Sequence, residues 1–84
     1  AQYPQVLVNV AANAAQKAAY KEDKVLADFI ENEQQKLMEM GRVLVRVSGT
    51  EPKIRVMVEG WDLEAIDLCA KRIVDKINER IIEG

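Results

Sequence analysis

The pattern of hydrophobic and polar positions is clearest in the middle of the chain, where it predicts a β-hairpin. Val or Ile occupies every second position of residues 42–47, and again of residues 54–59. This alternation is typical of strands that bury one face and expose the other. Because only a short segment containing Gly and Pro separates the two stretches, we expect them to pair as neighbouring antiparallel strands.

The alternation also indicates how the two strands pair. Residues directly opposite each other project to the same face of a sheet. Pairing Val47 with Ile54 aligns the β-branched residues of both strands on one continuous apolar face. The same register places Arg46 directly opposite Arg55 on the other face, and it leaves residues 49–52 as the loop.

Two longer segments, residues 24–39 and 63–82, predict amphipathic helices. In both, hydrophobic residues recur with the period of about 3.6 residues that places them on one helix face. Asp23 and Asp62 precede these segments and are typical N-cap residues. Gly41 follows the first segment, where we expect it to end the helix.

The remaining N-terminal part predicts one more strand and a connector. Residues 5–10 are short and β-branched and follow a Pro, which favours a strand. Residues 11–19 contain six Ala and no large apolar side chain, so we expect at most one helical turn there. The order strand, helix, strand, strand, helix predicts an α+β fold, in which two helices pack on one face of a small antiparallel sheet. Residues 1–84 form one domain in this interpretation.

The composition excludes several classes of function. The chain has no His and one Cys, so it offers neither a Ser–His triad nor the usual zinc ligand sets. We therefore expect no catalytic residue, no metal site and no cofactor within these 84 residues. A net charge of −2 and only one Trp, two Tyr and one Phe argue against a nucleic-acid-binding protein.

The cellular setting follows from features that the sequence lacks. A single Cys cannot form an internal disulfide, which favours a reducing cytoplasm. No apolar run approaches the roughly 18 residues of a membrane span, and the N-terminus does not resemble a secretory signal. We expect a cytoplasmic protein with no membrane partner. Because the sequence begins with Ala, we interpret it as one domain of a longer protein.

Charge is distributed unevenly along the chain. The helical segments are acidic, and we expect their Asp and Glu side chains to be solvated. Residues 42–58, by contrast, hold four basic residues against one acid. A basic island in an acidic protein predicts an anionic ligand. The basic residues are Arg42, Arg46, Lys53 and Arg55.

The hairpin loop combines the groups that bind phosphate. In the register above, Arg46 and Arg55 repel each other, and a phosphate between them would convert that repulsion into bidentate attraction. Ser48 and Thr50 supply hydroxyl groups, and Gly49 lets backbone N–H groups approach an anion. This is the chemistry of a binding site and not of a reacting one. The same residues are also ordinary turn residues, and two Arg on a solvent-exposed face are common.

The segment Arg-x-Ser-Gly-Thr-Glu-Pro-x-x-Arg, residues 46–55, resembles the phosphate-binding loop of the C-terminal domain of the α-D-phosphohexomutases. Residues 3–10 and 55–60 look like the bacterial phosphoglucosamine mutase branch of that family, whereas residues 11–21 match nothing. One position departs from the pattern, because the family usually has Pro where Val47 stands. The change puts the stiffness of the loop in doubt.

The resemblance implies a four-domain enzyme of which this chain is the fourth domain, with a fold like that of the TATA-box-binding protein. The first domain would carry a phosphorylated serine, the second a Mg²⁺ ion and the third a loop that reads the sugar. The fourth would bind the non-reacting phosphate of the substrate. By this resemblance, the phosphate ligands are Arg46, Ser48, Gly49, Thr50 and Arg55.

The implied reaction interconverts glucosamine 6-phosphate and glucosamine 1-phosphate through a bisphosphate. The implied partners are a glucosamine phosphate and the other domains of the same enzyme, and we expect the 84 residues alone to be inactive. Two alternatives remain open at this point. One is the same domain of a phosphoglucomutase or phosphomannomutase, and the other is a separate small α+β module that binds nucleic acid or a partner protein.

Overall fold

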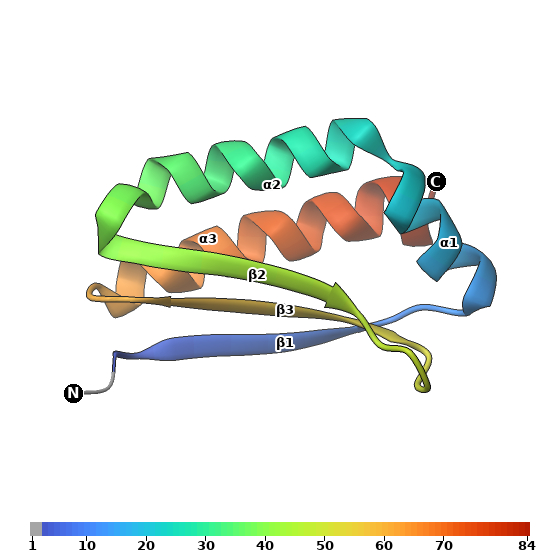
Figure 1. Ribbon diagram of the computed structural model, residues 1–84, viewed down its shortest axis with the longest axis horizontal. Coiled ribbons are helices and arrows are strands. Elements are labelled where there is room, and N and C mark those ends of the chain that lie inside the picture. The colour runs from blue at the N-terminus through green and yellow to red at the C-terminus, as the bar shows by residue number, and fades with distance from the viewer. Residues whose placement is uncertain (1–2) are drawn as a thin grey trace.

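Three antiparallel strands form a sheet, and helices cover one of its faces (Figure 1). The computed structural model describes residues 3–84. In chain order, its main elements are β1 (Gln5–Ala11), α1 (Ala14–Glu22), α2 (Lys24–Leu37), β2 (Gly41–Val47), β3 (Lys53–Gly60) and α3 (Leu63–Ile77). β3 is the central strand, between β1 and β2. The α+β fold predicted from the sequence is confirmed.

The core lies between the sheet and the two long helices. α3 packs on β1 and β3, and α2 packs on β2 and on α3. The side chains of Ile54, Val56 and Val58 in the central strand are fully buried. Burial of each such side chain contributes about 1.5–3 kcal/mol to folding. The inward face of β3 is therefore the centre of the core.

The predicted hairpin register is confirmed. Val47 lies opposite Ile54, and Arg46 lies opposite Arg55. On the other side of β3, β1 adds Asn9 directly opposite Arg55. Strand pairing thus forms a row of three polar residues on the face that carries no helix, while the β-branched residues face the core.

The expectation of a mere connector at residues 11–19 is wrong, because the segment contains most of α1, a helix of nine residues. Asn13 and Gln16 form a reciprocal capping box: the Gln16 N–H donates to Asn13 Oδ1 at 2.8 Å, and the Asn13 N–H donates to Gln16 Oε1 at 2.7 Å. Half-buried Tyr20 packs against the core cluster. One aromatic residue therefore docks a helix that lacks an apolar stripe.

Both predicted N-caps are confirmed. Asp62 accepts hydrogen bonds from two N–H groups of the first turn of α3. Asp23 accepts the N–H of Leu26 in α2, and it also forms a bidentate pair with Arg80, with N···O distances of 2.8 and 3.1 Å. Hydrogen bonding by Arg80 is the main reason why the pKa of Asp23 lies below its usual value. The residue thus ties the α1–α2 junction to the C-terminal turn, Asn78–Ile82.

The predicted end of the first long helix needs correction. α2 ends at Leu37 and not near residue 39, and Met38 follows with a positive φ of 54°. Gly41 does not cap the helix; it begins β2 in an extended conformation. A Cβ at this position would lie 2.7 Å from the carbonyl oxygen of Glu59. The glycine is needed for close strand pairing.

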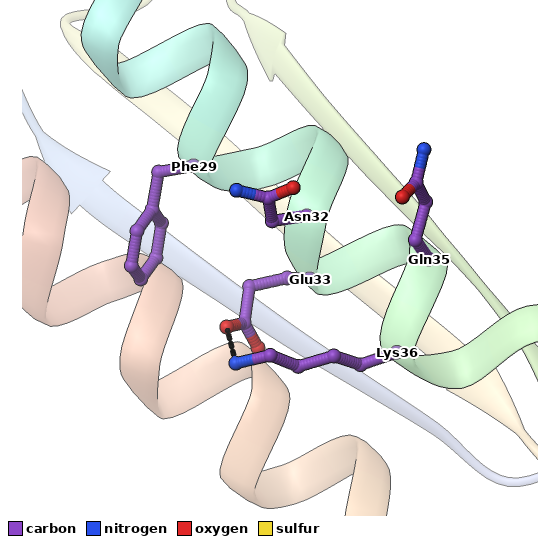
Figure 2. A pocket seen from close by; sticks show the side chains of 5 residues that line it. All are labelled: Phe29, Asn32, Glu33, Gln35 and Lys36. Carbon is purple, nitrogen blue, oxygen red and sulfur yellow. Dashed lines mark hydrogen bonds and ion pairs between the residues drawn. The ribbon is translucent and has the colours of Figure 1, made fainter.

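One acid of α2 is not solvated as expected. Glu33 is 1% exposed, and its carboxylate accepts hydrogen bonds from Lys36 and from Arg72 of α3, both at 3.0 Å. Figure 2 shows the contact with Lys36 beside the ring of Phe29. Burial acts to raise the pKa of Glu33, but the two hydrogen bonds outweigh it, and the pKa is lowered. This ion-paired carboxylate joins the two long helices.

We expect Glu33→Gln to lower the free energy of unfolding by about 1–2 kcal/mol at pH 7. The effect is smaller than for a fully buried pair because the side chains of Lys36 and Arg72 remain 61% and 39% exposed, so that water screens them. Urea unfolding measures it. Glu31→Gln, at an exposed position of the same helix, is the control and should change stability by less than about 0.5 kcal/mol.

The same measurement has a pH dependence. Because the folded pKa of Glu33 is lowered, its stabilisation is present above the pKa of about 4.3 that Glu has in unfolded chains. It is lost as the pH falls through the folded value, so the parent and the variant should converge in acid. Equal stability of the two at pH 7 would contradict this account of Glu33.

Candidate anion-binding site

A small pocket lies where β2 ends and β3 begins. Its volume is about 180 Å³. It is lined by Arg46, Val47, Ser48, Glu51, Lys53 and Arg55. Three of these side chains are cationic and one is anionic, which makes the pocket a basic region of an acidic chain. Three of the four residues of the predicted basic island therefore line one concave site, whereas Arg42 lies at the other end of the hairpin.

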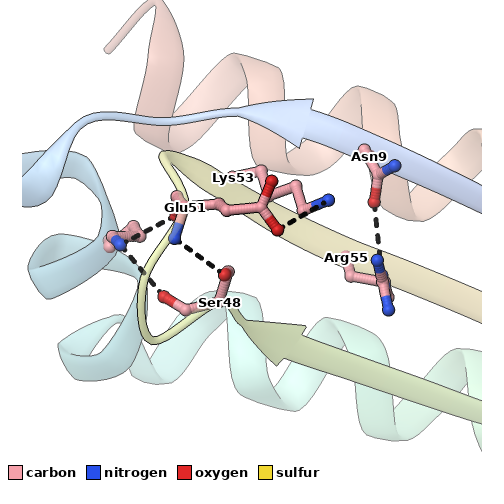
Figure 3. Close-up of polar contacts among 6 residues, drawn as sticks. Asn9, Ser48, Glu51, Lys53 and Arg55 are labelled. Carbon is pink, nitrogen blue, oxygen red and sulfur yellow. Dashed lines mark hydrogen bonds and ion pairs between the residues drawn. The ribbon is translucent and has the colours of Figure 1, made fainter.

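The two arginines lie on the open face of the sheet, where both are exposed. Their side-chain direction follows from the strand register, since the alternate residues are buried on the helical side. Arg55 Nε also lies 3.4 Å from Asn9 Oδ1, as Figure 3 shows. Asn9 was not predicted as part of the site, because its position opposite Arg55 depends on the pairing of β1 with β3.

The loop between the strands is held by its own hydrogen bonds. The Ser48 N–H donates to the carbonyl of Lys53 at 3.0 Å, and the Glu51 N–H donates to Ser48 Oγ at the same distance. Among residues 3–84, the N–H groups of Gly49 and Thr50 donate to no protein acceptor. Two backbone donors of an ordered loop are thus left for solvent or for a ligand.

A lysine of α1 forms hydrogen bonds with the backbone of the same loop. Lys17 Nζ donates to the carbonyl oxygens of Ser48 and Glu51, at 2.9 and 3.0 Å. The bonds span more than thirty residues of sequence, and neither carbonyl can be identified from the residues around Lys17. The only signal in the sequence is a single lysine within an Ala-rich segment. Sequence reasoning therefore missed Lys17, together with the helix that presents it.

Glu51 has a partner other than the two arginines. Its carboxylate lies 3.5 Å from Lys53 Nζ, and Figure 3 shows the two side chains facing each other across the base of the loop. The pair offsets one positive charge of the pocket, and in the described part of the chain neither Arg46 nor Arg55 forms an ion pair with a carboxylate. The local charge that faces solvent is therefore dominated by the guanidinium groups.

Three of the five predicted phosphate ligands lie in one pocket. Arg46, Ser48 and Arg55 line one pocket, whereas Gly49 and Thr50 are exposed in the loop and are not among its lining residues. Whether these five residues bind phosphate stays a prediction. Val47, at the position that is usually Pro in the resembled family, is half-buried and packs against the core.

Within residues 3–84, no group of three His, Cys, Asp or Glu side chains has an arrangement that could hold a metal ion. No helix there is long and apolar enough to cross a membrane. Cys69 is buried in α3, and burial together with the nearby charge of Glu33 raises the pKa of its thiol to about 11. This thiol is therefore a packing group and not a nucleophile.

Comparison with known proteins places residues 7–76 in the family described as "Phosphoglucomutase/phosphomannomutase, C-terminal domain". The chain is 46% identical over 79 residues to the phosphoglucosamine mutase of Caldicellulosiruptor bescii. This match covers 94% of this chain and 18% of the relative. It is 51% identical over 73 residues to the phosphoglucosamine mutase of Acidovorax ebreus, and this match covers 87% of this chain and 16% of the relative. The chain thus spans less than a fifth of the length of these relatives.

Solved structures of mutases have a fold similar to that of this chain. N-acetylphosphoglucosamine mutase of Aspergillus fumigatus in complex with glucose 1,6-bisphosphate is similar to this chain with a TM-score of 0.76 at 27% identity, over 94% of this chain and 16% of that one. The complex of the same fungal enzyme with GlcNAc-6P and magnesium gives a TM-score of 0.69 at 26% identity. This match covers 89% of this chain and 16% of the fungal one.

We expect Lys17→Met to loosen the loop. Loss of two charge-assisted hydrogen bonds removes restraints on the carbonyls of Ser48 and Glu51. Amide hydrogen exchange at Ser48 and Glu51, whose N–H groups are hydrogen-bonded within the loop, should then accelerate about tenfold or more. The matched control is Lys21→Met, one turn later in α1, whose side chain is exposed. It should leave these amides unchanged. Equal exchange in both variants would show that Lys17 does not order the loop.

Proposed function

Since the chain belongs to the phosphoglucomutase/phosphomannomutase C-terminal domain family, we propose that it binds the phosphate group of a phosphosugar at the loop between β2 and β3. In this proposal the chain is the C-terminal domain of a larger phosphoglucosamine mutase, and the phosphate that it holds is the one that does not react. Arg46, Ser48, Gly49, Thr50 and Arg55 are the proposed ligands.

The observation that carries the proposal is the pairing of Arg46 with Arg55. Like charges directly opposite each other destabilise a sheet by some tenths of a kcal/mol, so a protein gains nothing in stability from this arrangement. Neither guanidinium has a carboxylate partner among residues 3–84. A dianionic phosphate between them would satisfy both with bidentate hydrogen bonds.

The loop supports the same interpretation. The hydroxyl of Ser48 accepts from the loop itself and still has its hydrogen to donate. A Cβ at Gly49 would meet no atom within 4 Å, so the fold does not require a glycine there. Its lack of a side chain instead leaves room for a ligand beside the free N–H groups of Gly49 and Thr50.

The choice of sugar rests on the relatives. Those that match over most of this chain, at 44–51% identity, are named phosphoglucosamine mutase. We therefore propose glucosamine 6-phosphate and glucosamine 1-phosphate as the substrates of the parent enzyme, which would interconvert them through a bisphosphate. The same domain of a phosphoglucomutase or phosphomannomutase is the alternative, because the loop that reads the sugar would lie in another domain.

A site of this kind suits such a reaction. The bisphosphate has to turn around between two phosphoryl transfers, so one site must accept a phosphate from either end of the sugar. Arginines and backbone N–H groups recognise phosphate geometry and are indifferent to the ring. Transfer itself depends on positioning and electrostatic stabilisation.

The reacting groups would lie in other domains of the parent enzyme. The family resemblance implies a phosphoserine and Mg²⁺ there, and one fungal relative was solved with magnesium. Among residues 3–84, the acidic side chains do not form a cluster that could hold such an ion. The chain's own part is to bind and orient the substrate. We place the parent enzyme in the cytoplasm, where its sugar phosphates would be found.

Titration of the 84-residue chain with inorganic phosphate tests binding. We expect amide shifts in the NMR spectrum that are confined to residues 46–55 and to Asn9, with weak affinity. The site is exposed, so raising the salt concentration should weaken binding further. Sulfate should compete. Shifts spread over the whole surface, or affinity that is the same at low and high salt, would argue against a phosphate site at the loop.

In the parent enzyme, Arg46→Ala and Arg55→Ala should each lower kcat/KM about ten- to a hundredfold, since a hydrogen bond to a charged group contributes about 1.5–3 kcal/mol. The double variant should lose less than the product of the single effects, because both side chains bind one phosphate and one removal relieves their repulsion. Steady-state kinetics on all three variants measure this.

Lys71→Ala is the control, because Lys71 is an exposed cation of α3, a helix that packs on the other face of the sheet. It should leave kcat/KM within about twofold. Strictly multiplicative losses at Arg46 and Arg55 would contradict a shared phosphate. No variant should lower the unfolding midpoint by much, because both arginines lie outside the core, and removal of either one relieves their repulsion.

A further inference from the structure

The end of the molecule far from the loop carries a group of exposed apolar side chains. We call it the apolar end surface, and it consists of Tyr3, Met38, Met40, Trp61 and Leu63. Each of these side chains is between 46% and 74% exposed. They make up five of the eight large hydrophobic residues that are exposed among residues 3–84. Such clustering marks an interaction surface more often than scattered apolar residues do.

Three of the five residues, Tyr3, Met40 and Trp61, form a connected centre of this surface. The Gly60 N–H donates to the carbonyl of Pro4 at 3.1 Å, and the Trp61 N–H donates to that of Met40 at 3.0 Å. The rings of Tyr3 and Trp61 lie 4.6 Å apart between centroids. Together with Met40, these rings line a groove of about 150 Å³. Chain segments far apart in sequence are thus joined in one place by backbone hydrogen bonds.

Met38, one residue of this surface, has an unfavourable backbone conformation. Its φ of 54° lies in the region that favours glycine, and for a residue with a Cβ this costs about 1–2 kcal/mol. The Met38 side chain is nevertheless 74% exposed, so it recovers little by burial in the isolated domain. A long apolar side chain at a strained and exposed position contributes stability only if another surface covers it.

The position of the surface indicates its occupant. Tyr3, near the start of the described chain, is itself part of it. Figure 1 shows the start of β1 at the same end of the molecule as the end of α2, and at the opposite end from the β2–β3 loop. The family model is that of a C-terminal domain, and the matched segment is 16–18% of the relatives. In such proteins the remaining four-fifths precede the domain and reach it at this end.

We propose that the apolar end surface packs against the preceding part of the same polypeptide in the parent enzyme. This rests on the first half of the proposed function, that the chain is the C-terminal domain of a larger mutase. The contact would bury the aromatic pair and both methionines, and it would leave the phosphate loop, at the opposite end of the sheet, uncovered.

Two cysteine variants on one helix test the proposal. Leu63→Cys lies in the surface, and Leu68→Cys, with a parent side chain of similar exposure, lies outside it. The native thiol of Cys69 gives little background because it is buried and its pKa is raised to about 11. Maleimide labelling is followed at each site by peptide mass spectrometry, in the 84-residue chain and in the full-length enzyme. Met38→Cys is a second variant within the surface.

In the 84-residue chain, Leu63→Cys and Leu68→Cys should react at similar rates that do not depend on protein concentration. In the full-length enzyme, labelling of Leu63→Cys and Met38→Cys should fall at least tenfold, while that of Leu68→Cys should not change. Equal rates in both proteins would overturn the proposal. So would slowing at Leu63→Cys with rising concentration of the 84-residue chain, because the occupant would then be a second copy.

The readout is independent of phosphate binding. Phosphate shifts without thiol protection would leave the proposed function intact and overturn the docking surface. Thiol protection without phosphate shifts would overturn the phosphate site and leave intact the docking surface and the C-terminal position on which it rests. Folding of each variant is checked by circular dichroism before labelling, and exposed positions on a helix should tolerate Cys within about 0.5 kcal/mol.

Discussion

The pairing register of β2 and β3 is the constraint on which the rest of the structure depends. Side chains alternate between the two faces of a strand, so a slip of one residue would exchange the faces. The observed register buries Ile54, Val56 and Val58 and exposes Arg46 and Arg55. One set of backbone hydrogen bonds therefore fixes both the core and the charged pair. The apolar face enforces a juxtaposition of arginines that the arginines themselves would oppose.

The hairpin, the fold class and the helix starts could be predicted because each is encoded locally. Alternation identifies a strand, and Asp23 and Asp62 are recognisable as caps beside the apolar stripes that they precede. The site residues on the hairpin were identifiable for the same reason. Their relative positions follow from the pairing of two strands that are neighbours in the sequence.

What the sequence could not provide depends on contacts between distant segments. Helix α1 lacks an apolar stripe, and it forms because a capping box starts it and Tyr20 docks it. Glu33 is identical in residue type to the solvated acids of α2, and only the approach of Arg72 from α3 explains its burial. Asn9 and Lys17 reach the site from β1 and α1, across separations that no local pattern encodes.

The central strand has a mechanical consequence. β3 extends from Lys53, beside the loop, to Gly60, beside the apolar end surface, and its eight residues span about 25 Å. Close pairing on both sides leaves it little freedom to bend. A rotation of the strand by about 10° about its Gly60 end would displace the loop by about 4 Å. If the domain is held at the apolar end surface as proposed, a small adjustment there would be enough to move the two arginines toward a phosphate or away from it.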